Sequence, residues 1–238
     1  MPEAKGTPRA SRPVVIWDTS QKVAVISDLH LGSAFCRWEA ALAWLGSLPE
    51  DVLVALNGDI LDDVRRSLPA THRQVLDRLV EASFEREMVW VVGNHDDDLP
   101  WESIGRITVV RHLEIGKSLL VIHGDYFDDV MPRSRLFISV FAALHALRLK
   151  LGAPHVHVAE YAKKWRPLYK VLNDNVKENA AASARRNGFQ AVVCGHTHHP
   201  MDIVHKGVRY LNTGAWTEEP LHYLQMENGR IQMSVFSP

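Results

Sequence analysis

Short apolar runs that each end in a polar turn set the strongest limit on how this 238-residue chain can fold. Five of the runs lead directly into a segment that supplies Asp, Asn or His. These segments are Asp28-Leu29-His30, Gly58-Asp59, Gly93-Asn94-His95-Asp96, His123-Gly124-Asp125 and Gly195-His196-Thr197-His198. Strands of a parallel sheet bring their carboxyl ends to one rim, so the pattern predicts that these polar side chains gather there.

The first hundred residues predict strands that alternate with helices. Residues 22–27, 52–56 and 88–92 are apolar enough for buried strands, whereas residues 35–48 and 70–87 carry apolar side chains at helical spacing. This order is typical of strand–helix–strand units, and it therefore predicts a parallel sheet.

The pattern changes after this part of the chain. Residues 107–122 predict two further strands, and residues 191–194 predict another. Between about residues 126 and 188 the sequence shows no strand pattern, so we expect a helical insertion. Short strands then alternate with turns at Lys206-Gly207 and Asn228-Gly229, which predicts hairpins of a second sheet.

Length, composition and charge limit the domain count and the class of partner. With 46% hydrophobic and 23% charged residues, the chain suits one globular domain, which we place at residues 14–238 after a mobile tail of residues 1–13. A formal net charge of −1 argues against a general nucleic-acid-binding protein. Its two cysteines lie far apart, no signal-peptide pattern opens the sequence, and no apolar run reaches the ~20 residues of a membrane span. We therefore expect a cytoplasmic protein.

The polar segments together offer seven candidate metal ligands. They comprise two carboxylates, one amide oxygen and four imidazoles: Asp28, Asp59, Asn94, His30, His123, His196 and His198. Asp28 and His30 are two residues apart at a strand end, so we expect both side chains to point to one face. A carboxylate has two oxygens, so sharing Asp59 gives four protein ligands to each of two ions.

Two such ions ~3.5–4 Å apart can hold a bridging hydroxide and clamp phosphate oxygens during an in-line displacement. Nitrogen and oxygen ligands without thiolate favour Mn²⁺, Fe or Zn²⁺, of which we expect Mn²⁺. The sequence therefore predicts a two-metal phosphoester hydrolase.

This combination of motifs resembles the calcineurin-like metallophosphoesterase superfamily over residues 28–198. The resemblance implies an α/β fold, a four-layer α-β-β-α sandwich of two mixed sheets, with a helical cap insertion. It implies that one metal is bound by Asp28, His30, Asp59 and His198. It implies that the other is bound by Asp59, Asn94, His123 and His196.

The resemblance also separates one histidine from the metals. His95 is expected to point over the substrate phosphate, where it would stabilise transition-state charge and protonate the leaving oxygen. Asp62 matches a position that often pairs with this histidine, and such a carboxylate would hold the imidazole tautomer; otherwise it is a solvated turn carboxylate. Asp96 and Asp125 are expected to orient ligands.

Within the superfamily, the chain is most similar to the bacterial UDP-2,3-diacylglucosamine pyrophosphatases of lipid A synthesis. The similar segments are residues 27–32, His123-Gly124-Asp125 with Asp128-Asp129, the helical insertion, and residues 212–216. This similarity implies cleavage of a lipid-linked nucleotide diphosphate into UMP and a lipid monophosphate, with acyl chains held under the cap. One departure is clear: well-known members carry Arg where this chain has His95.

The expected insertion contains residues suited to such a substrate. Residues 136–147 are strongly apolar between basic residues, as in a helix that grips acyl chains or rests on the inner membrane leaflet; a helix buried within the insertion would look the same. The candidate substrate contacts are Asn94, His95, Asp129, Lys163, Lys164 and Lys170. The lysines are equally consistent with a solvated helix face.

Two other functions remain open. A phosphodiesterase or phosphatase for a small soluble nucleotide would use the same metal centre and need no apolar cap. A non-catalytic scaffold of the same fold would be expected to have lost ligands or the catalytic histidine, and here none is missing.

Overall fold

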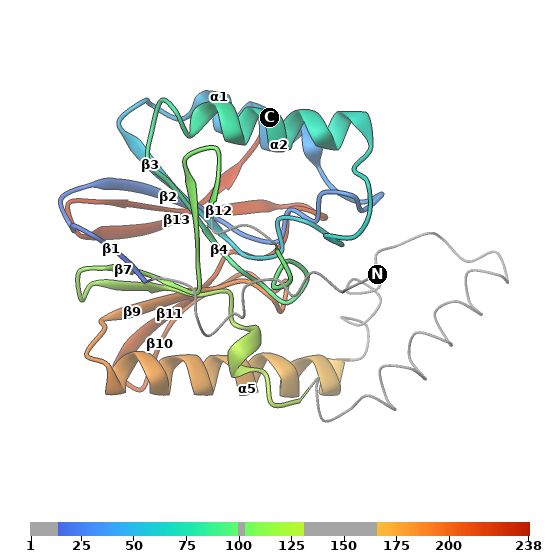
Figure 1. Cartoon of the computed structure of the whole chain (residues 1–238). Helices are drawn as coiled ribbons and strands as arrows, with labels where there is room; N and C mark the ends of the chain where they lie inside the picture. Colours follow the sequence, from blue (N-terminus) through green and yellow to red (C-terminus); the bar gives the residue numbers. More distant parts are fainter. Residues whose placement is uncertain (1–13, 100–102, 131–165) are drawn as a thin grey trace, which may run out of the picture.

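The computed structural model describes residues 14–99, 103–130 and 166–238 (Figure 1). Two mixed β-sheets lie face to face. Helices α1 (Trp38–Ser47) and α2 (Ala70–Ala82) cover one sheet, and α5 (Arg166–Arg186) covers the other. This is the predicted α-β-β-α sandwich. Among the described helices, none is long and apolar enough to cross a membrane.

One sheet has seven strands in the order β13-β12-β2-β3-β4-β6-β5. Its strands are β2 (Lys22–Ile26), β3 (Val52–Asn57), β4 (Met88–Val91), β5 (Ser103–Ile104), β6 (Ile107–Val110), β12 (Leu221–Glu227) and β13 (Arg230–Phe236). β2, β3 and β4 pair in parallel, as the first hundred residues predict, and β6 also pairs in parallel with β4. Helix α2 ends earlier than predicted, because Ser83 Oγ bonds back to the Val80 carbonyl and accepts the Arg106 N–H.

The second sheet has six strands in the order β1-β7-β8-β9-β11-β10. These are β1 (Val15–Trp17), β7 (Leu113–Ile115), β8 (Leu119–Val121), β9 (Ala191–Cys194), β10 (Met201–His205) and β11 (Val208–Asn212). The prediction of two strands in residues 107–122 was wrong. That segment forms β6, β7 and β8, because the polar pair Arg111-His112 carries the chain from one sheet to the other and Gly116 (φ 51°) turns it again.

The two predicted hairpins exist but belong to different sheets. Positive φ angles at Lys206-Gly207 (49° and 82°) and Asn228-Gly229 (49° and 76°) form the predicted tight turns. The β10–β11 hairpin extends the six-stranded sheet, whereas β12–β13 joins the seven-stranded sheet beside β2. The second hairpin is placed there because Leu224 and Met226 of β12 face the core between the sheets.

Alternate residues of the central strands serve different apolar layers. Val54 and Leu56 of β3 pack toward α1 and α2, whereas Ala55 packs between the sheets. Val193 of β9 also lies between the sheets, and Val192 faces α5. Both faces of these strands are therefore buried, which fixes the positions of the loops that follow them.

The predicted insertion is only partly visible. Its described ends are the 3₁₀ turn η2 (Asp125–Phe127) and helix α5. The apolar stretch at residues 136–147 and the tail at residues 1–13 lie outside the described residues.

Candidate metal centre

The seven candidate ligands meet where strands of both sheets end. Two follow β2, one follows β3 and one follows β4 in the seven-stranded sheet; one follows β8 and two follow β9 in the six-stranded sheet. In that order they are Asp28 and His30, Asp59, Asn94, His123, and His196 with His198. The site thus draws ligands from both halves of the sandwich.

A first cluster consists of Asp28, His30 and His198, all of them buried. Asp28 Oδ1 lies 3.2 Å from His198 Nε2 and 4.0 Å from His30 Nε2. The two imidazole Nε2 atoms are 3.2 Å apart. These are three of the four residues that the family resemblance assigns to one metal.

A second cluster consists of Asp59, His123 and His196. Asp59 Oδ2 lies 3.1 Å from His123 Nε2, and Asn94 Oδ1 lies 2.9 Å from His196 Nδ1. The structure therefore brings all four residues of the second predicted metal site together.

Outward hydrogen bonds fix which ring nitrogen faces each cluster. His30 Nδ1 lies 3.1 Å from Asp62 Oδ1, His123 Nδ1 lies 2.9 Å from the Asn57 carbonyl oxygen, and His196 Nε2 lies 2.9 Å from Asp128 Oδ2. Each of these nitrogens must carry hydrogen, because its partner only accepts. The opposite nitrogen, which faces the carboxylate or amide oxygens, is then the one that can hold a lone pair. Inward-facing ring nitrogens and carboxylate or amide oxygens repel one another unless protons or metal ions lie between them. These residues therefore fit a pair of divalent metal ions.

The charges of the site agree with this interpretation. Burial opposes ionisation of Asp59, but His123 and then His30 hold the pKa of its carboxyl well below its usual range. Burial also opposes the charge on Asp28, while His123 and His198 lower the pKa of that carboxyl. Conversely, burial works against protonation of His123, but Asp59 and Asp28 raise its pKa well above the usual value. The carboxylates are therefore ionised and available to cations.

Five of the seven candidate ligands have left-handed backbone conformations. Their φ angles are 55° at Asp28, 50° at His30, 53° at Asp59, 62° at His196 and 53° at His198. We expected Asp28 and His30 to point to one face because they lie two residues apart at a strand end. That reason was wrong, because β2 ends at Ile26 and both residues have left-handed backbones. Main-chain bonds hold these loops instead: Asp28 N donates to the Gly58 carbonyl and His30 N to the Asp59 carbonyl.

Two glycines leave room for the carboxylates. A Cβ added to Gly93 would collide with Asp59 Oδ1, and a Cβ added to Gly195 would collide with Asp28 Oδ2. Both glycines directly precede candidate ligands, so side chains larger than hydrogen at these positions would displace the site.

His95 lies at the exposed side of the centre. Its main-chain N–H donates to Asp59 Oδ1 at 2.9 Å, and its Nδ1 lies 2.7 Å from the Asp62 carbonyl oxygen. The family resemblance offered the Asp62 carboxylate as the group that holds this ring, with a solvated turn carboxylate as the alternative. In the structure the main-chain carbonyl takes that position, and the carboxylate contacts the buried His30 instead. His30, Asp62 and His95 also lie within 4.8 Å of one another, so the metal content of a His95 variant decides whether this histidine belongs to a metal group.

The two other predicted orienting residues have distinct positions. Asp96 is fully buried and accepts N–H groups from Gly93, Ile60 and Trp90, which ties the β3 and β4 loops together. Burial and the charge of Asp59 raise the pKa of Asp96 to about 6. Asp125 begins η2 directly after the His123 loop.

Sequence reasoning missed the contact between Asp128 and His196. The buried Asp128 carboxylate accepts the Nε2 proton of His196 and, through Oδ1, the Val130 N–H. Asp128 could have been found from the Asp128-Asp129 pair that follows His123-Gly124-Asp125. Of that pair, however, only Asp129 was predicted to be functional, as a substrate contact.

Removing the Asp128 carboxylate should weaken metal binding. We expect Asp128→Ala to lower Mn²⁺ affinity by about 10–100-fold, because groups that orient metal-binding histidines have effects of this size. Calorimetric titration of the metal-free protein with Mn²⁺ measures this affinity. Asp129→Ala is the matched control for affinity, since this neighbouring carboxylate is exposed and contacts Asn179. Equal affinity of the two variants would show that Asp128 does not set the His196 tautomer.

The predicted substrate contacts are scattered. Asn94 and His95 are exposed beside the clusters, and Asp129 is exposed next to α5. Lys170 pairs with Asp174 at 2.5 Å along α5, as expected of a solvated helix face. Lys163 and Lys164 lie outside the described residues.

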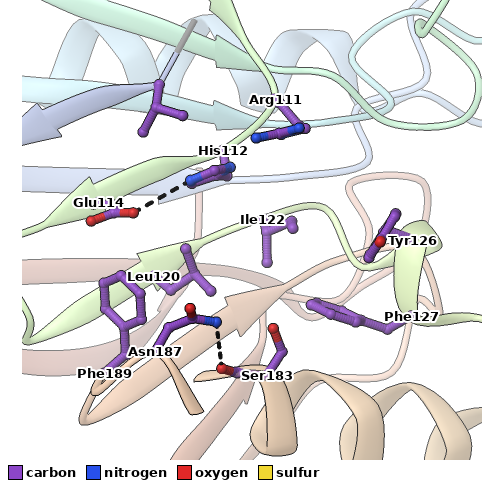
Figure 2. A pocket seen from close by; sticks show the side chains of 11 residues that line it. Arg111, His112, Glu114, Leu120, Ile122, Tyr126, Phe127, Ser183, Asn187 and Phe189 are labelled. Atoms are coloured by element: carbon purple, nitrogen blue, oxygen red, sulfur yellow. Dashed lines mark hydrogen bonds and ion pairs between the residues drawn. The ribbon is translucent and has the colours of Figure 1, made fainter. Parts of the chain in front are cut away.

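A separate cleft of 480 Å³ opens on the outer side of the six-stranded sheet, between β8 and α5 (Figure 2). Leu120, Ile122, Phe127 and Phe189 supply its apolar lining, and the His112–Glu114 pair lies at its rim (Figure 2). None of the seven candidate ligands lines it, so this cleft is distinct from the metal centre.

Paired Asp and His clusters at the ends of parallel strands are typical of metal-dependent hydrolases. A family model described as calcineurin-like phosphoesterase matches residues 21–200, and the chain belongs to this family. The protein is therefore a metal-dependent phosphoester hydrolase, and its clustered residues suggest a binuclear divalent centre. A comparison with curated proteins found no match.

The chain is similar to solved structures that include a phosphoesterase, a phosphatase and a phosphodiesterase. Yfce, a phosphoesterase from E. coli, is 17% identical, with 91% of this chain and 97% of that chain covered and a TM-score of 0.46. A cold-active protein-tyrosine phosphatase of a psychrophile, Shewanella sp., is 14% identical, with 100% and 85% covered and a TM-score of 0.47. A novel archaeal phosphodiesterase is 16% identical, with 91% and 100% covered and a TM-score of 0.46.

Proposed function

We propose that this protein uses two divalent ions, most simply Mn²⁺, to hydrolyse the diphosphate bond of a nucleotide-linked lipid such as UDP-2,3-diacylglucosamine. One observation supports the reaction class above all others. Two clusters of carboxylates and imidazoles, in which His30, His123 and His196 turn their hydrogen-bearing nitrogens outward, lie side by side at one rim. Asp28, His30 and His198 would hold one ion, Asn94, His123 and His196 the other, and Asp59 both.

When bound, the ions supply Lewis acidity toward the phosphate and lower the pKa of the attacking water. The protein's own contribution to proton transfer is His95. Since its Nδ1 donates to the Asp62 carbonyl, its Nε2 is left to carry a proton toward the exposed side. With Nδ1 held by this carbonyl, a proton carried at Nε2 can stabilise phosphate charge and then pass to the leaving oxygen.

The lipid-linked substrate is supported by the sequence motifs shared with the UDP-2,3-diacylglucosamine pyrophosphatases and by the apolar residues 136–147. By this proposal the enzyme works in the cytoplasm and contacts the inner leaflet of the membrane, where its substrate resides. Asp129, Lys163, Lys164 and Lys170 are candidates for binding the diphosphate or sugar.

A second candidate function is hydrolysis of a small soluble nucleotide phosphodiester or monoester. His95 favours it, because well-known members of the lipid pyrophosphatase group carry Arg at this position. The apolar stretch would then have no role in substrate binding.

A substrate panel with Mn²⁺ separates the two functions. We expect release of UMP from UDP-2,3-diacylglucosamine at a kcat/KM at least about tenfold above that for soluble nucleotide diphosphates or bis-p-nitrophenyl phosphate, since acyl chains add apolar binding area. The hydrolysis products, UMP among them, are quantified chromatographically with each substrate at equal concentration. Preference for a soluble substrate would support the second function, and no hydrolysis of any of them with two ions bound would contradict both.

A further inference from the structure

The main chain of His196-Thr197-His198 is held in an uncommon conformation by hydrogen bonds. Both histidines have left-handed backbones, and the Thr197 N–H bonds back to the Gly195 carbonyl at 2.6 Å. A non-glycine residue in this conformation costs about 1 kcal/mol or more, so surrounding contacts must hold it in place. The plane of the peptide after Thr197 sets the φ angle of His198, and therefore the direction in which its ring leaves the backbone.

Three side chains hold this loop from different parts of the fold. Asp28 Oδ1 accepts the His196 N–H at 3.1 Å, and Asn212 Nδ2 donates to the Gly195 carbonyl at 2.6 Å. The Tyr169 hydroxyl donates to the Thr197 carbonyl oxygen at 2.6 Å. Tyr169 thus bonds directly to the peptide that sets His198.

Tyr169 is itself held in position near the start of α5. Its main-chain carbonyl accepts Asn173 Nδ2 at 2.8 Å. Its ring meets His199 edge to face, with centroids 5.6 Å apart. Burial raises the pKa of the phenol, so the hydroxyl stays protonated and keeps donating throughout the neutral range. A Phe at this position would keep the ring contact and remove only the hydrogen bond.

We infer that Tyr169 is a positioning residue for the metal centre: by fixing the Thr197 carbonyl it holds His196 and His198 in the conformation that binds divalent ions. This inference rests on the proposed dimetal function and deepens it. It predicts that the phenol hydroxyl acts on metal affinity rather than mainly on folding.

Calorimetric titration of metal-free Tyr169→Phe with Mn²⁺ tests the inference. We expect affinity to fall about tenfold, which is the size expected for losing one group that orients ligands. Tyr223→Phe is the matched control, because Tyr223 packs on Trp44 in the other half of the sandwich and should leave Mn²⁺ affinity unchanged. Titrations are done well below the melting temperature of each variant, so that lower stability cannot imitate weaker binding.

The outcomes separate this inference from the proposed function. A wild-type protein that binds no Mn²⁺ contradicts the dimetal proposal itself. A wild-type protein that binds two ions together with unchanged affinity in Tyr169→Phe overturns the positioning role alone. Melting of the metal-free variants completes the comparison: a lower melting temperature with wild-type affinity makes Tyr169 merely structural, and also overturns the inference.

Discussion

Asp59→Asn should reduce turnover at least about a thousandfold, because it removes the carboxylate charge that both donor sets share. Two-metal sites supply several kcal/mol of transition-state stabilisation, and each ~1.4 kcal/mol corresponds to a factor of ten in rate. The amide is nearly the same size and its oxygen can still accept the His95 N–H, so the surrounding loop should persist. Initial rates with saturating Mn²⁺ and metal content by mass spectrometry measure the effect.

Asp63→Asn is a suitable control for Asp59→Asn. Asp63 lies four residues away and forms a surface ion pair with Arg66, at 3.2 Å, so its loss should leave turnover unchanged. Wild-type turnover of Asp59→Asn with added Mn²⁺ would refute the shared role of Asp59.

His95→Ala should lower turnover about 10²–10⁴-fold, which is the range for loss of a general acid, and should leave metal content unchanged. The physical reason is geometric. The His95 ring bonds to a main-chain carbonyl at the exposed side and stands edge to face with His30, at a centroid distance of 4.9 Å. Turnover and bound metal are measured on the same preparation.

His222→Ala controls for the loss of an imidazole away from the metal centre, since its ring contacts only the nearby Pro220 carbonyl among the contacts described for it. Loss of metal from His95→Ala, but not from His222→Ala, would place His95 in the group with His30 and Asp62.

Hydrophobic pattern was enough to place the ligands at strand ends, because burial on both faces produces continuous apolar runs that stop where the loops begin. The hydrophobic pattern did not predict which sheet each of the two hairpins joins. Lys206-Gly207 and Asn228-Gly229 have the same turn chemistry, yet one hairpin extends each sheet. Sheet membership depends on long-range pairing of β12 with β2, which local sequence does not encode.

The candidate site shows a similar division. Residue types and spacing singled out the seven candidate ligands, but not the partners that orient their rings. The Asp62 side chain holds His30, and the Asp62 main-chain carbonyl holds His95. The residue type of Asp62 does not reveal which histidine its carboxylate contacts. Asp128 was overlooked because its role depends on η2 turning it toward His196.

The left-handed residues of the centre mark the positions of the rim at which sequence change is strongly constrained, and the other positions are freer to change. Asp28, Asp59 and His198 each combine a disfavoured backbone conformation with a buried side chain that faces its neighbours. An insertion or deletion in any of these loops would change both together, so drift there is strongly constrained. His95 is exposed and is free of such a backbone conformation. New substrate preferences in relatives of this enzyme should therefore arise at the position of His95 and in the insertion, around a metal-binding frame that stays the same.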